Sequence, residues 1–349
     1  MSATQKSIAT ELGISRQLVG FALNNHPGVS AETKQRVITA AQRLGYDAFA
    51  NRDARSLIAK RYGRRARTGI MAILLPPELE VPLRDMPYYA PILDGIEREA
   101  DRRGLDVLLC RARNGQMPRM IQNQYVDGVA CISTVPETMQ RLAEHGLPVI
   151  NLGRQTPGAC WICPDDKQGI ELAVEHLHEL GHSRIGYLGH TAEDINGKVR
   201  LASYKRGLKT AGLPLDESII EVLDVTQSLD GGSMAMEDML SKDSQFQKSG
   251  RPSFTALVAF NDMLGMGAIR CMQEHKIRVP QDVSVTGFDD ISTQYPIIPH
   301  LTSISFSRSE MGMRAIELLS ESNGEPLPAK GVHVPVTLVP RESSQALKK

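Results

Sequence analysis

The stretch TQKSIATELGISRQLVGFALN, residues 4–24, decides the fold at the N-terminal end of this chain. It contains two short helical patterns on either side of a turn at Gly13, and the second begins at Ser15, a good N-cap residue. Apolar residues recur at helical spacing in both patterns: Ile8, Ala9 and Leu12, then Leu18, Val19, Ala22 and Leu23. A third helical pattern begins after Ser30 and ends at Gly45. The sequence therefore predicts a small three-helix unit with one core.

The outward face of the second helix carries groups suited to reading DNA. Two helices joined by a tight glycine-bearing turn form a helix-turn-helix, whose second helix enters the major groove. That face presents Arg16, Gln17, Gly20 and Asn24. Arginine recognises guanine and glutamine recognises adenine. An ordinary helical bundle with solvated polar faces remains the alternative at this point.

Charge is distributed unevenly along the chain. Residues 1–67 carry twelve Lys or Arg and four Asp or Glu, a net charge of +8. The whole chain has 40 of each sign, so the remainder carries −8. A basic head of this kind is the electrostatic footprint of a phosphate-binding module. The basic run at 60–67 predicts an extended linker, with or without a partner.

Length and composition limit the other possibilities. With 349 residues, 41% of them hydrophobic, the chain can bury the cores of two or three compact units. No run of 18 apolar residues and no signal pattern occurs, so we expect a cytoplasmic protein without membrane association. The five cysteines are odd in number and lie mostly in apolar segments, as reduced core thiols do. Cys160 and Cys163 have CxxC spacing, but no second pair accompanies them to complete a zinc site.

From residue 68 onward, apolar strand patterns alternate with amphipathic helices. Strands are predicted at 69–75, 105–110, 127–132, 147–152, 184–188, 255–260 and 283–287. Helices are predicted at 89–103, 137–145, 168–180, 200–211, 231–242, 263–275 and 309–322. This alternation indicates parallel sheets covered on both faces, and so many units predict two doubly wound α/β lobes. Ligands of such sheets bind beyond the carboxyl ends of the strands, here between the lobes.

A set of motifs, in order and at characteristic spacing, resembles the lac repressor family of transcription regulators over nearly the whole chain. In the head they are QKSIATELGIS, GFALNN, PGVSAETKQRV and RLGY, followed by ARSL. In the body they are YYAPILDGIEREADRRGLDV, VDGV, PDDKQGIELAVEHLHELGHSRIGYLG, RLASYKRGLKTAGLP, AFNDMLGMGAIR, VPQDVSVTGFDD, PHLTSI and LVPRES. The resemblance implies a dimer with a periplasmic-binding-protein-like body, whose operator affinity is switched by a small molecule.

The resemblance also assigns DNA-contacting positions. Arg16 and Gln17 match the two main base-reading positions, with Ser15, Gly20 and Asn24 beside them. Phe21 stands where relatives often have Arg or His, and could touch a thymine methyl or a sugar instead. Ser30 and Thr33 match phosphate-contacting positions.

A hinge helix is implied between head and body. Leu57 matches the leucine that wedges into the minor groove, Ala54 packs beside it, and Asn51 is included among the DNA-contacting residues. The segment YDAFAN departs from the usual Tyr-x-Pro-Asn by two extra residues and by lacking proline. An ordinary helix-to-linker transition is therefore the alternative interpretation.

In the body the resemblance implies an effector site for a polar, sugar-like molecule. Its residues would be Tyr88, Tyr89, Arg200, Asn261, Asp262, Asp289 and Phe306. Arg, Asp and Asn can hydrogen-bond vicinal hydroxyls, and aromatic rings can stack on a sugar face. A helix N-cap is the alternative or additional role for the Asn-Asp pair, and a surface ion pair is the alternative for Arg200. Phe306 stands where many relatives have Gln.

No cofactor or metal is expected. His176 and His178 are two residues apart on a predicted helix, so they face different sides and cannot chelate together. Together with His182 and His190 they form a group of histidines close in sequence, and we do not expect this group to bind a metal ion.

Three classes of function compete on these observations. A plain solute-binding protein does not explain the helix-turn-helix. An α/β enzyme would be expected to show a GxSxG, Walker, HExxH or Rossmann glycine motif, and none occurs. We therefore interpret the chain as an effector-controlled DNA-binding repressor, not an enzyme, that acts as a homodimer on double-stranded operator DNA.

The expected domain boundaries follow from these assignments. The head covers 1–47, the hinge and basic linker 48–67, the effector-binding and dimerisation body 68–343, and the tail 344–349. Within the body, lobe 1 is expected at about 68–180 and 308–330, and lobe 2 at about 181–305 and 331–343.

Overall fold

A computed structural model of the chain forms two compact units, Met1–Thr68 and Gly69–Lys349. The structure describes residues 4–23, 26, 28–44, 46, 67–76, 87–112, 116–190, 194–224, 227–295 and 297–347. The predicted DNA contacts Asn24, Asn51, Ala54 and Leu57 lie outside these ranges, as does nearly all of the predicted hinge segment.

The first unit contains the three predicted helices, α1 (Gln5–Leu12), α2 (Arg16–Leu23) and α3 (Ala31–Arg43). Thr4 and Ser7 form a capping box at the start of α1, and Gly13 ends that helix with a φ of 64°. The buried apolar residues of the three helices and their connections form one small core: Ile8, Ala9, Val19, Ala22, Val29, Val37, Ala40 and Ala41. The predicted inward faces of α1 and α2 are therefore correct.

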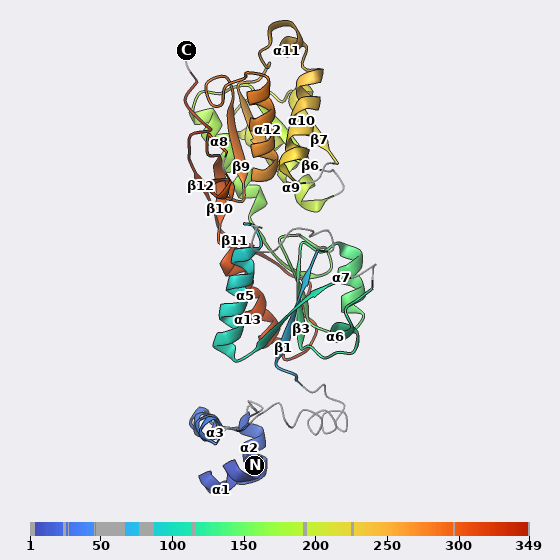
Figure 1. Ribbon diagram of the computed structural model, residues 1–349, viewed down its shortest axis with the longest axis vertical. Coiled ribbons are helices and arrows are strands. Elements are labelled where there is room, and N and C mark those ends of the chain that lie inside the picture. Colours follow the sequence, from blue (N-terminus) through green and yellow to red (C-terminus); the bar gives the residue numbers. More distant parts are fainter. Residues whose placement is uncertain are drawn as a thin grey trace. The chain divides into compact units, whose positions relative to one another are not determined.

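The second unit contains two six-stranded sheets (Figure 1). The first sheet has the order β11-β5-β4-β3-β1-β2 and is parallel throughout. Its strands are β1 (Ile70–Leu75), β2 (Asp106–Arg111), β3 (Gly128–Ile132), β4 (Val149–Leu152), β5 (Cys160–Pro164) and β11 (Gly331–Val334). Helices cover both faces, as the continuous apolar strands predicted.

Alternate residues of β1 point to opposite faces of this sheet. Met71 and Ile73 join the core beneath α5 (Ala90–Arg103) and α13 (Arg308–Glu321). Ala72 and Leu74 join the core beneath α6 (Arg119–Gln122) and α7 (Pro136–Ala143). Figure 1 shows these two helix layers on either side of the sheet.

Helices α5 and α13 touch through their backbones. A Cβ atom on Gly95 would lie 2.0 Å from the carbonyl oxygen of Ser309, and one on Gly312 would lie 2.1 Å from that of Ile92. No side chain fits in either place, so both positions require glycine.

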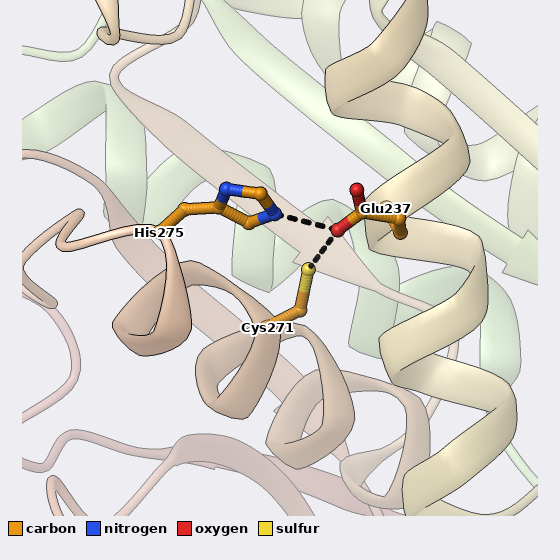
Figure 2. Close-up of side chains that lie close together, drawn as sticks. All are labelled: Glu237, Cys271 and His275. Carbon is orange, nitrogen blue, oxygen red and sulfur yellow. Dashed lines mark hydrogen bonds and ion pairs between the residues drawn. The ribbon is translucent and has the colours of Figure 1, made fainter.

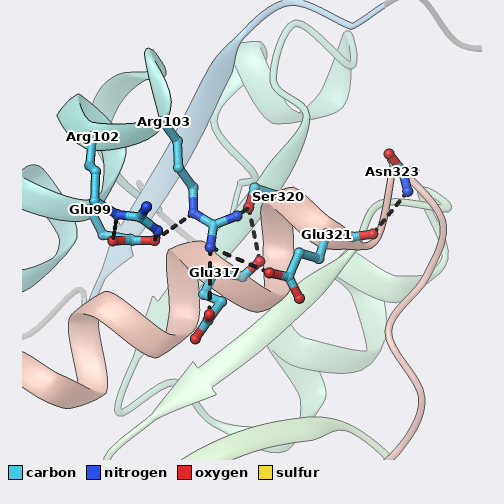
Figure 3. Close-up of polar contacts among 7 residues, drawn as sticks. All are labelled: Glu99, Arg102, Arg103, Glu317, Ser320, Glu321 and Asn323. Carbon is cyan, nitrogen blue, oxygen red and sulfur yellow. Dashed lines mark hydrogen bonds and ion pairs between the residues drawn. The ribbon is translucent and has the colours of Figure 1, made fainter. Parts of the chain in front are cut away.

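A charged network continues the contact between these helices at their C-terminal ends (Figure 3). Arg102 and Arg103 both hydrogen-bond the buried Glu99, at 2.7 Å and 2.5 Å. Arg103 extends to α13, where it donates to Ser320 at 2.7 Å and pairs with Glu321 at 3.4 Å. These hydrogen bonds from Arg102, and next from Arg103, lower the pKa of Glu99 to about 2 against the opposing effect of burial.

The second sheet has the order β12-β10-β9-β8-β6-β7. Its strands are β6 (Ile185–His190), β7 (Ile220–Leu223), β8 (Ala256–Ala259), β9 (Ser284–Phe288), β10 (Thr302–Phe306) and β12 (Val336–Val339). Only β12 runs antiparallel, against β10. The helices around it are α8 (Asp166–Glu179), α9 (Ile195–Thr210), α10 (Leu229–Lys242), α11 (Ser244–Ser249) and α12 (Asp262–Glu274), with short 3-10 turns at Glu217–Ile219 and Ser292–Gln294.

The chain crosses between the sheets three times, and each crossing leaves a single residue between two regular elements. These residues are Asp165 between β5 and α8, Ser307 between β10 and α13, and Pro335 between β11 and β12. The amide of Asp165 donates to the carbonyl of Val334 at 3.1 Å, which ties the first crossing to the third.

Two parts of the expected lobe boundaries differ from the structure. Helix α8 was assigned to lobe 1, but it packs on α9 and against the strands of the second sheet. Strand β11 was assigned to lobe 2, but it pairs with β5 of the first sheet. Because single-residue crossings leave no loop in the sequence, these switches were not visible there.

One hydrophobic core connects both sheets. It runs from β1, α5 and α13 of the first sheet to α8, α9, β9 and β10 of the second. A separate cluster fills the opposite face of the second sheet beneath α10 and α12. In the part of the chain that the structure describes, no helix combines the length and the apolar character needed to cross a membrane.

Candidate functional sites

The exposed face of α2 carries the predicted base-reading residues. Ser15, Arg16 and Gln17 are exposed at its start, whereas Val19 and Ala22 are buried against the other helices. Ser15 accepts a hydrogen bond from the amide of Leu18 at 3.1 Å, so it caps the helix as predicted. Arg16 and Gln17, the predicted base-reading residues, therefore lie on the exposed side of a helix whose other face packs in the core of the head.

Phe21 and Gly20 are the two positions at which α2 departs from the usual recognition helix. Phe21 is 40% exposed and stacks on His26, with ring centroids 4.7 Å apart. A Cβ on Gly20 would meet only a glutamine side-chain oxygen at 3.8 Å, so packing does not require glycine there. The predicted phosphate contacts Ser30 and Thr33 hydrogen-bond each other at 2.8 Å, and Ser30 caps α3.

In the body, Arg200 belongs to α9, and its side chain is buried, so it does not form a surface ion pair. Its exposed fraction is 5%, and its Nε and Nη2 atoms lie 2.8 Å and 2.7 Å from one oxygen of the fully buried Asp166. Its Nη1 donates to the carbonyl of Phe260 at 2.5 Å. The surface alternative for Arg200 is therefore wrong.

Two aromatic rings enclose the guanidinium of Arg200. Its central carbon lies 3.8 Å from the ring centroid of Phe288 and 4.5 Å from that of Phe260. Such cation–π contacts strengthen when the cation is removed from water. We call Asp166, Arg200, Phe260, Phe288 and Asp289, together with Tyr88 and Phe306, the Arg200 cluster.

Asp289 follows β9 and holds an uncommon backbone conformation. Its φ is 107° and that of Asp290 is 56°, and few non-glycine residues adopt either value. The amide of Asp289 donates to Ile304, and its carbonyl accepts from Arg308. These bonds fix the turn, and the buried carboxylate of Asp289 interacts electrostatically with Arg200. Burial raises the pKa of Asp289 to about 6, opposed mainly by the charges of Arg200 and Arg308.

The first sheet contributes aromatic rings to the same cluster. Tyr88 lies just before α5, 5.2 Å from the Tyr89 ring and 6.4 Å from the Phe306 ring by centroid. Phe306 in turn lies 5.9 Å from Phe288. Desolvation, followed by the charge of Asp289, raises the pKa of Tyr88 well above its usual value, so its hydroxyl stays neutral. Groups from both sheets therefore converge on one place.

Asn261 and Asp262 serve the local structure. Asn261 caps α12 by accepting from the amide of Leu264 at 3.0 Å, and its amide donates to Gln227 at 2.8 Å. Asp262 is fully buried and accepts from Ile291 at 2.7 Å and from the Ser303 hydroxyl. The capping role is therefore present, and an additional ligand-binding role for Asn261 stays a prediction.

A polar bridge links the sheets beside the cluster. The Asn196 side chain on α9 donates to Gly153 at 3.0 Å and accepts from the amide of Gln155 at 3.1 Å, both in the loop after β4. Gln155 also donates to Asp166 at 3.1 Å. Neither Asn196 nor Asp166 was identified from the sequence. Asp166 follows the N-cap Asp165 of α8, and an acidic residue there is usual in any first helical turn.

Two of the histidines considered for metal binding, His176 and His182, have hydroxyl partners. His176 lies 2.9 Å from the Ser344 hydroxyl, and the buried His182 lies 3.0 Å from those of Thr255 and Ser284. All five cysteines are free and buried, and burial raises the pKa of Cys163.

Comparison with known proteins gives matches along nearly the whole chain. A family model described as periplasmic binding protein-like domain matches residues 174–344. The HTH-type transcriptional regulator CelR of Thermobifida fusca is 29% identical, over 90% of each chain. The HTH-type transcriptional regulator reg1 of Streptomyces lividans is 30% identical, over 94% of this chain and 92% of its own. A solved structure of the transcriptional regulator CelR–cellobiose complex is 27% identical and covers 98% of this chain and 100% of that chain, with a TM-score of 0.69. These relatives are named as transcriptional regulators.

Proposed function

We propose, since the chain belongs to the LacI family of helix-turn-helix transcriptional regulators, that it is a repressor whose head binds an operator and whose body binds a small polar effector. The observation that carries the proposal is the Arg200 cluster, where charged groups of the second sheet meet Tyr88, which precedes α5 beside the first sheet. A ligand held there contacts both sheets and can favour one relative orientation of them. A coupling of about 1–3 kcal/mol between effector and operator changes operator affinity roughly 5- to 150-fold.

Within the head, Arg16 and Gln17 are the proposed base-reading residues. Their exposure on α2 and the net charge of +8 over residues 1–67 support this assignment. The test is a binding titration of the full-length protein on its own upstream DNA, with each base position of the site varied in turn. Arg16→Ala should lose about 1–3 kcal/mol of discrimination at one base pair. Arg36→Ala, an equal loss of charge on α3, should weaken binding to all sequences alike.

A body fragment from residue 68 onward provides the opposing test. It lacks the basic head, and so it should not bind the site specifically. Specific binding by this fragment would refute the assignment of DNA affinity to the head.

The segment ARSL at 54–57 is proposed to form a hinge helix that orders on the operator, with Leu57 as the minor-groove wedge and Ala54 and Asn51 beside it. A helix this short is marginal by itself in water, and an apolar wedge kinks DNA by unstacking a base step. Leu57→Ala should bind more weakly and bend the operator less, as measured by gel mobility of circularly permuted fragments. Wild-type bending by this variant would remove the wedge assignment.

The effector is proposed to be sugar-like. The cluster offers carboxylate, guanidinium and neutral phenol groups between aromatic faces, which suits a ring with vicinal hydroxyls. The CelR structure with cellobiose is a likeness that agrees with this chemistry. A thermal-shift screen of sugars, sugar phosphates and nucleobases identifies the ligand, because binding to the native state raises the midpoint. A response confined to nucleobases would overturn the sugar proposal.

The protein is further proposed to act as a dimer, because an operator with two half-sites matches a two-fold protein. Sedimentation at micromolar concentration should show dimers and not tetramers. We expect the protein to work in the cytoplasm, where its operator is, and to catalyse no reaction.

A further inference from the structure

Three metal-ligating side chains meet on the second sheet's outer helix layer, away from the Arg200 cluster (Figure 2). Cys271 and His275 come from the end of α12, and Glu237 comes from α10. The Glu237 carboxylate oxygen lies 2.6 Å from His275 Nε2 and 3.4 Å from Cys271 Sγ. One ligand atom from each of the three residues lies within 4.8 Å of the others.

The spacing along α12 explains why two of these groups share a face. Residues four apart on a helix are neighbours on its surface, so Cys271 and His275 point the same way. The histidines at 176 and 178 lack this spacing, and the Cys-x3-His pattern within 271–275 was not recognised in the sequence. Glu237 adds a third ligand from a helix distant in sequence.

The helices that carry these ligands are held at a fixed separation. A Cβ on Gly232 of α10 would lie 2.4 Å from the carbonyl oxygen of Leu264, and one on Gly267 of α12 would lie 2.2 Å from that of Leu229. Ser233 adds a 2.9 Å hydrogen bond to the carbonyl of Gly267. Backbone contact of this kind leaves little freedom for the helices to separate, which preorganises ligands on both sides.

Two of the three ligand–ligand distances agree with a small tetrahedral ion after a minor adjustment, and the third, between sulfur and nitrogen, is at most 4.8 Å. Zinc bonds of about 2.0–2.3 Å to oxygen, nitrogen and sulfur separate neighbouring ligand atoms by roughly 3.3–3.7 Å. The sulfur–oxygen distance already fits. The nitrogen–oxygen distance must widen by somewhat under 1 Å, and the Glu237 side chain, 59% exposed, is able to rotate that far.

The surroundings favour a cation that arrives from solvent. Glu237 and Cys271 line a surface hollow of about 600 Å³ together with Asp238 and Glu274. The ligands from α12 lie at its C-terminal end, where the helix dipole is negative. The ring of Phe246 packs edge-on against His275, at 5.5 Å and 88°, and orients the imidazole.

We propose that Glu237, Cys271 and His275 bind one Zn²⁺ ion, with water in the fourth position. Thiolate, imidazole and carboxylate are the ligands that zinc takes in proteins. The bound ion replaces the thiol proton of Cys271 and joins α10 to α12. Asn261 caps the opposite end of α12, with the 13 residues of the helix between it and the C-cap His275, so the site lies roughly 20 Å along the helix from the Arg200 cluster.

The test uses reduced, full-length, metal-free protein. Calorimetric titration with Zn²⁺ should show one equivalent bound, and Co²⁺ should give thiolate charge-transfer absorption and the strong visible bands of a tetrahedral complex. Cys271→Ser, His275→Gln and Glu237→Gln should each weaken Zn²⁺ binding by at least about 10- to 100-fold. Cys110→Ser and His178→Gln, which remove the same chemical groups elsewhere, should bind like wild type.

Absence of the thiolate band, or unchanged affinity in Cys271→Ser, overturns the proposal. Should the buried Cys271→Ser variant fail to fold, the two surface variants decide. Wild-type affinity in both His275→Gln and Glu237→Gln rejects the site, whereas loss in both supports it. Zinc should also raise the unfolding midpoint of wild type and not that of the three ligand variants.

Discussion

Arg200 donates from two nitrogen atoms to the same carboxylate oxygen of Asp166, at 2.8 Å and 2.7 Å. The arginine belongs to α9, and its partner stands one residue beyond the crossing at Asp165. This buried pair therefore holds the crossing onto the second sheet, besides placing a guanidinium in the proposed effector site. A substitution of Arg200 changes both functions at once.

The first prediction concerns this pair. Arg200→Ala leaves the Asp166 carboxylate buried without its charge partner, and we expect unfolding free energy to fall by about 3–5 kcal/mol. The double variant Asp166→Asn, Arg200→Gln removes both charges and should lose clearly less. Urea unfolding measures both variants. Equal losses would mean that the ion pair is not what stabilises this region.

The second prediction separates ligand binding from stability through Asp289. Its carboxylate interacts electrostatically with Arg200, Arg308, Asp166 and Tyr88, and its pKa is raised to about 6 by burial. A ligand that hydrogen-bonds the charged carboxylate should bind more tightly as pH rises through about 6, because below that value the group is protonated. Asp289→Asn should bind weakly and without this pH dependence.

The matched control for this experiment is Asp290→Asn. Asp290 pairs with Arg341, also has a positive φ that suits asparagine, and belongs to the same turn. It should retain the effector affinity and the pH dependence. If both variants lose binding equally, the turn and not the Asp289 carboxylate is responsible.

The third prediction concerns Asp262, whose pKa burial raises to about 8, with Asp289 as the next largest cause. Because the folded pKa lies above the unfolded one, this group favours the native state at low pH and disfavours it as pH rises toward 8. Asp262→Asn lacks that dependence. The stability of wild type relative to this variant should therefore decrease by a few kcal/mol, on the order of 1.4 kcal/mol per pKa unit, between pH 5 and 9. A flat difference in chemical unfolding over that range would contradict the assignment.

The fourth prediction concerns Glu99, whose pKa is shifted in the opposite direction from that of Asp262. Its pKa is lowered to about 2, so its stabilising effect is present above about pH 4.5 and is lost as pH falls toward 2. Glu99→Gln should destabilise the protein by roughly 1–3 kcal/mol at neutral pH, with the difference vanishing in acid. Asp94→Asn, which alters an exposed pair on the same helix, should change stability by less than about 1 kcal/mol.

Much of the architecture could be predicted because its signals are local. The turn at Gly13 and the cap at Ser15 mark the head, and seven apolar runs mark strands that the structure contains within a few residues, six of them inside the sheets and one, β2, at an edge. Strands β5, β7, β10, β11 and β12 were not predicted. Several of these are short or lie at sheet edges, and half-buried residues interrupt their apolar pattern.

The composition of the candidate site was harder to predict for a different reason. Arg200 and Asp289 could be named from motifs, but Asp166 reaches Arg200 only because α8 packs on the second sheet. In the sequence, Phe260 and Phe288 are recognisable only as residues at the ends of strands. They contact the guanidinium of Arg200 because β8, β9 and α9 come together in the fold. Long-range pairing of this kind has no local signature.

The three one-residue crossings at Asp165, Ser307 and Pro335 restrict how the sheets can reorient. Three short tethers allow rotation about the line that they define and very little sliding. Asp166 and Phe306 of the Arg200 cluster adjoin two of these tethers. A ligand bound at the cluster therefore lies close to the axis about which the sheets rotate. A small displacement of the sheets at the cluster then becomes a larger displacement at the far end of the first sheet, where β1 begins and the chain from the head enters.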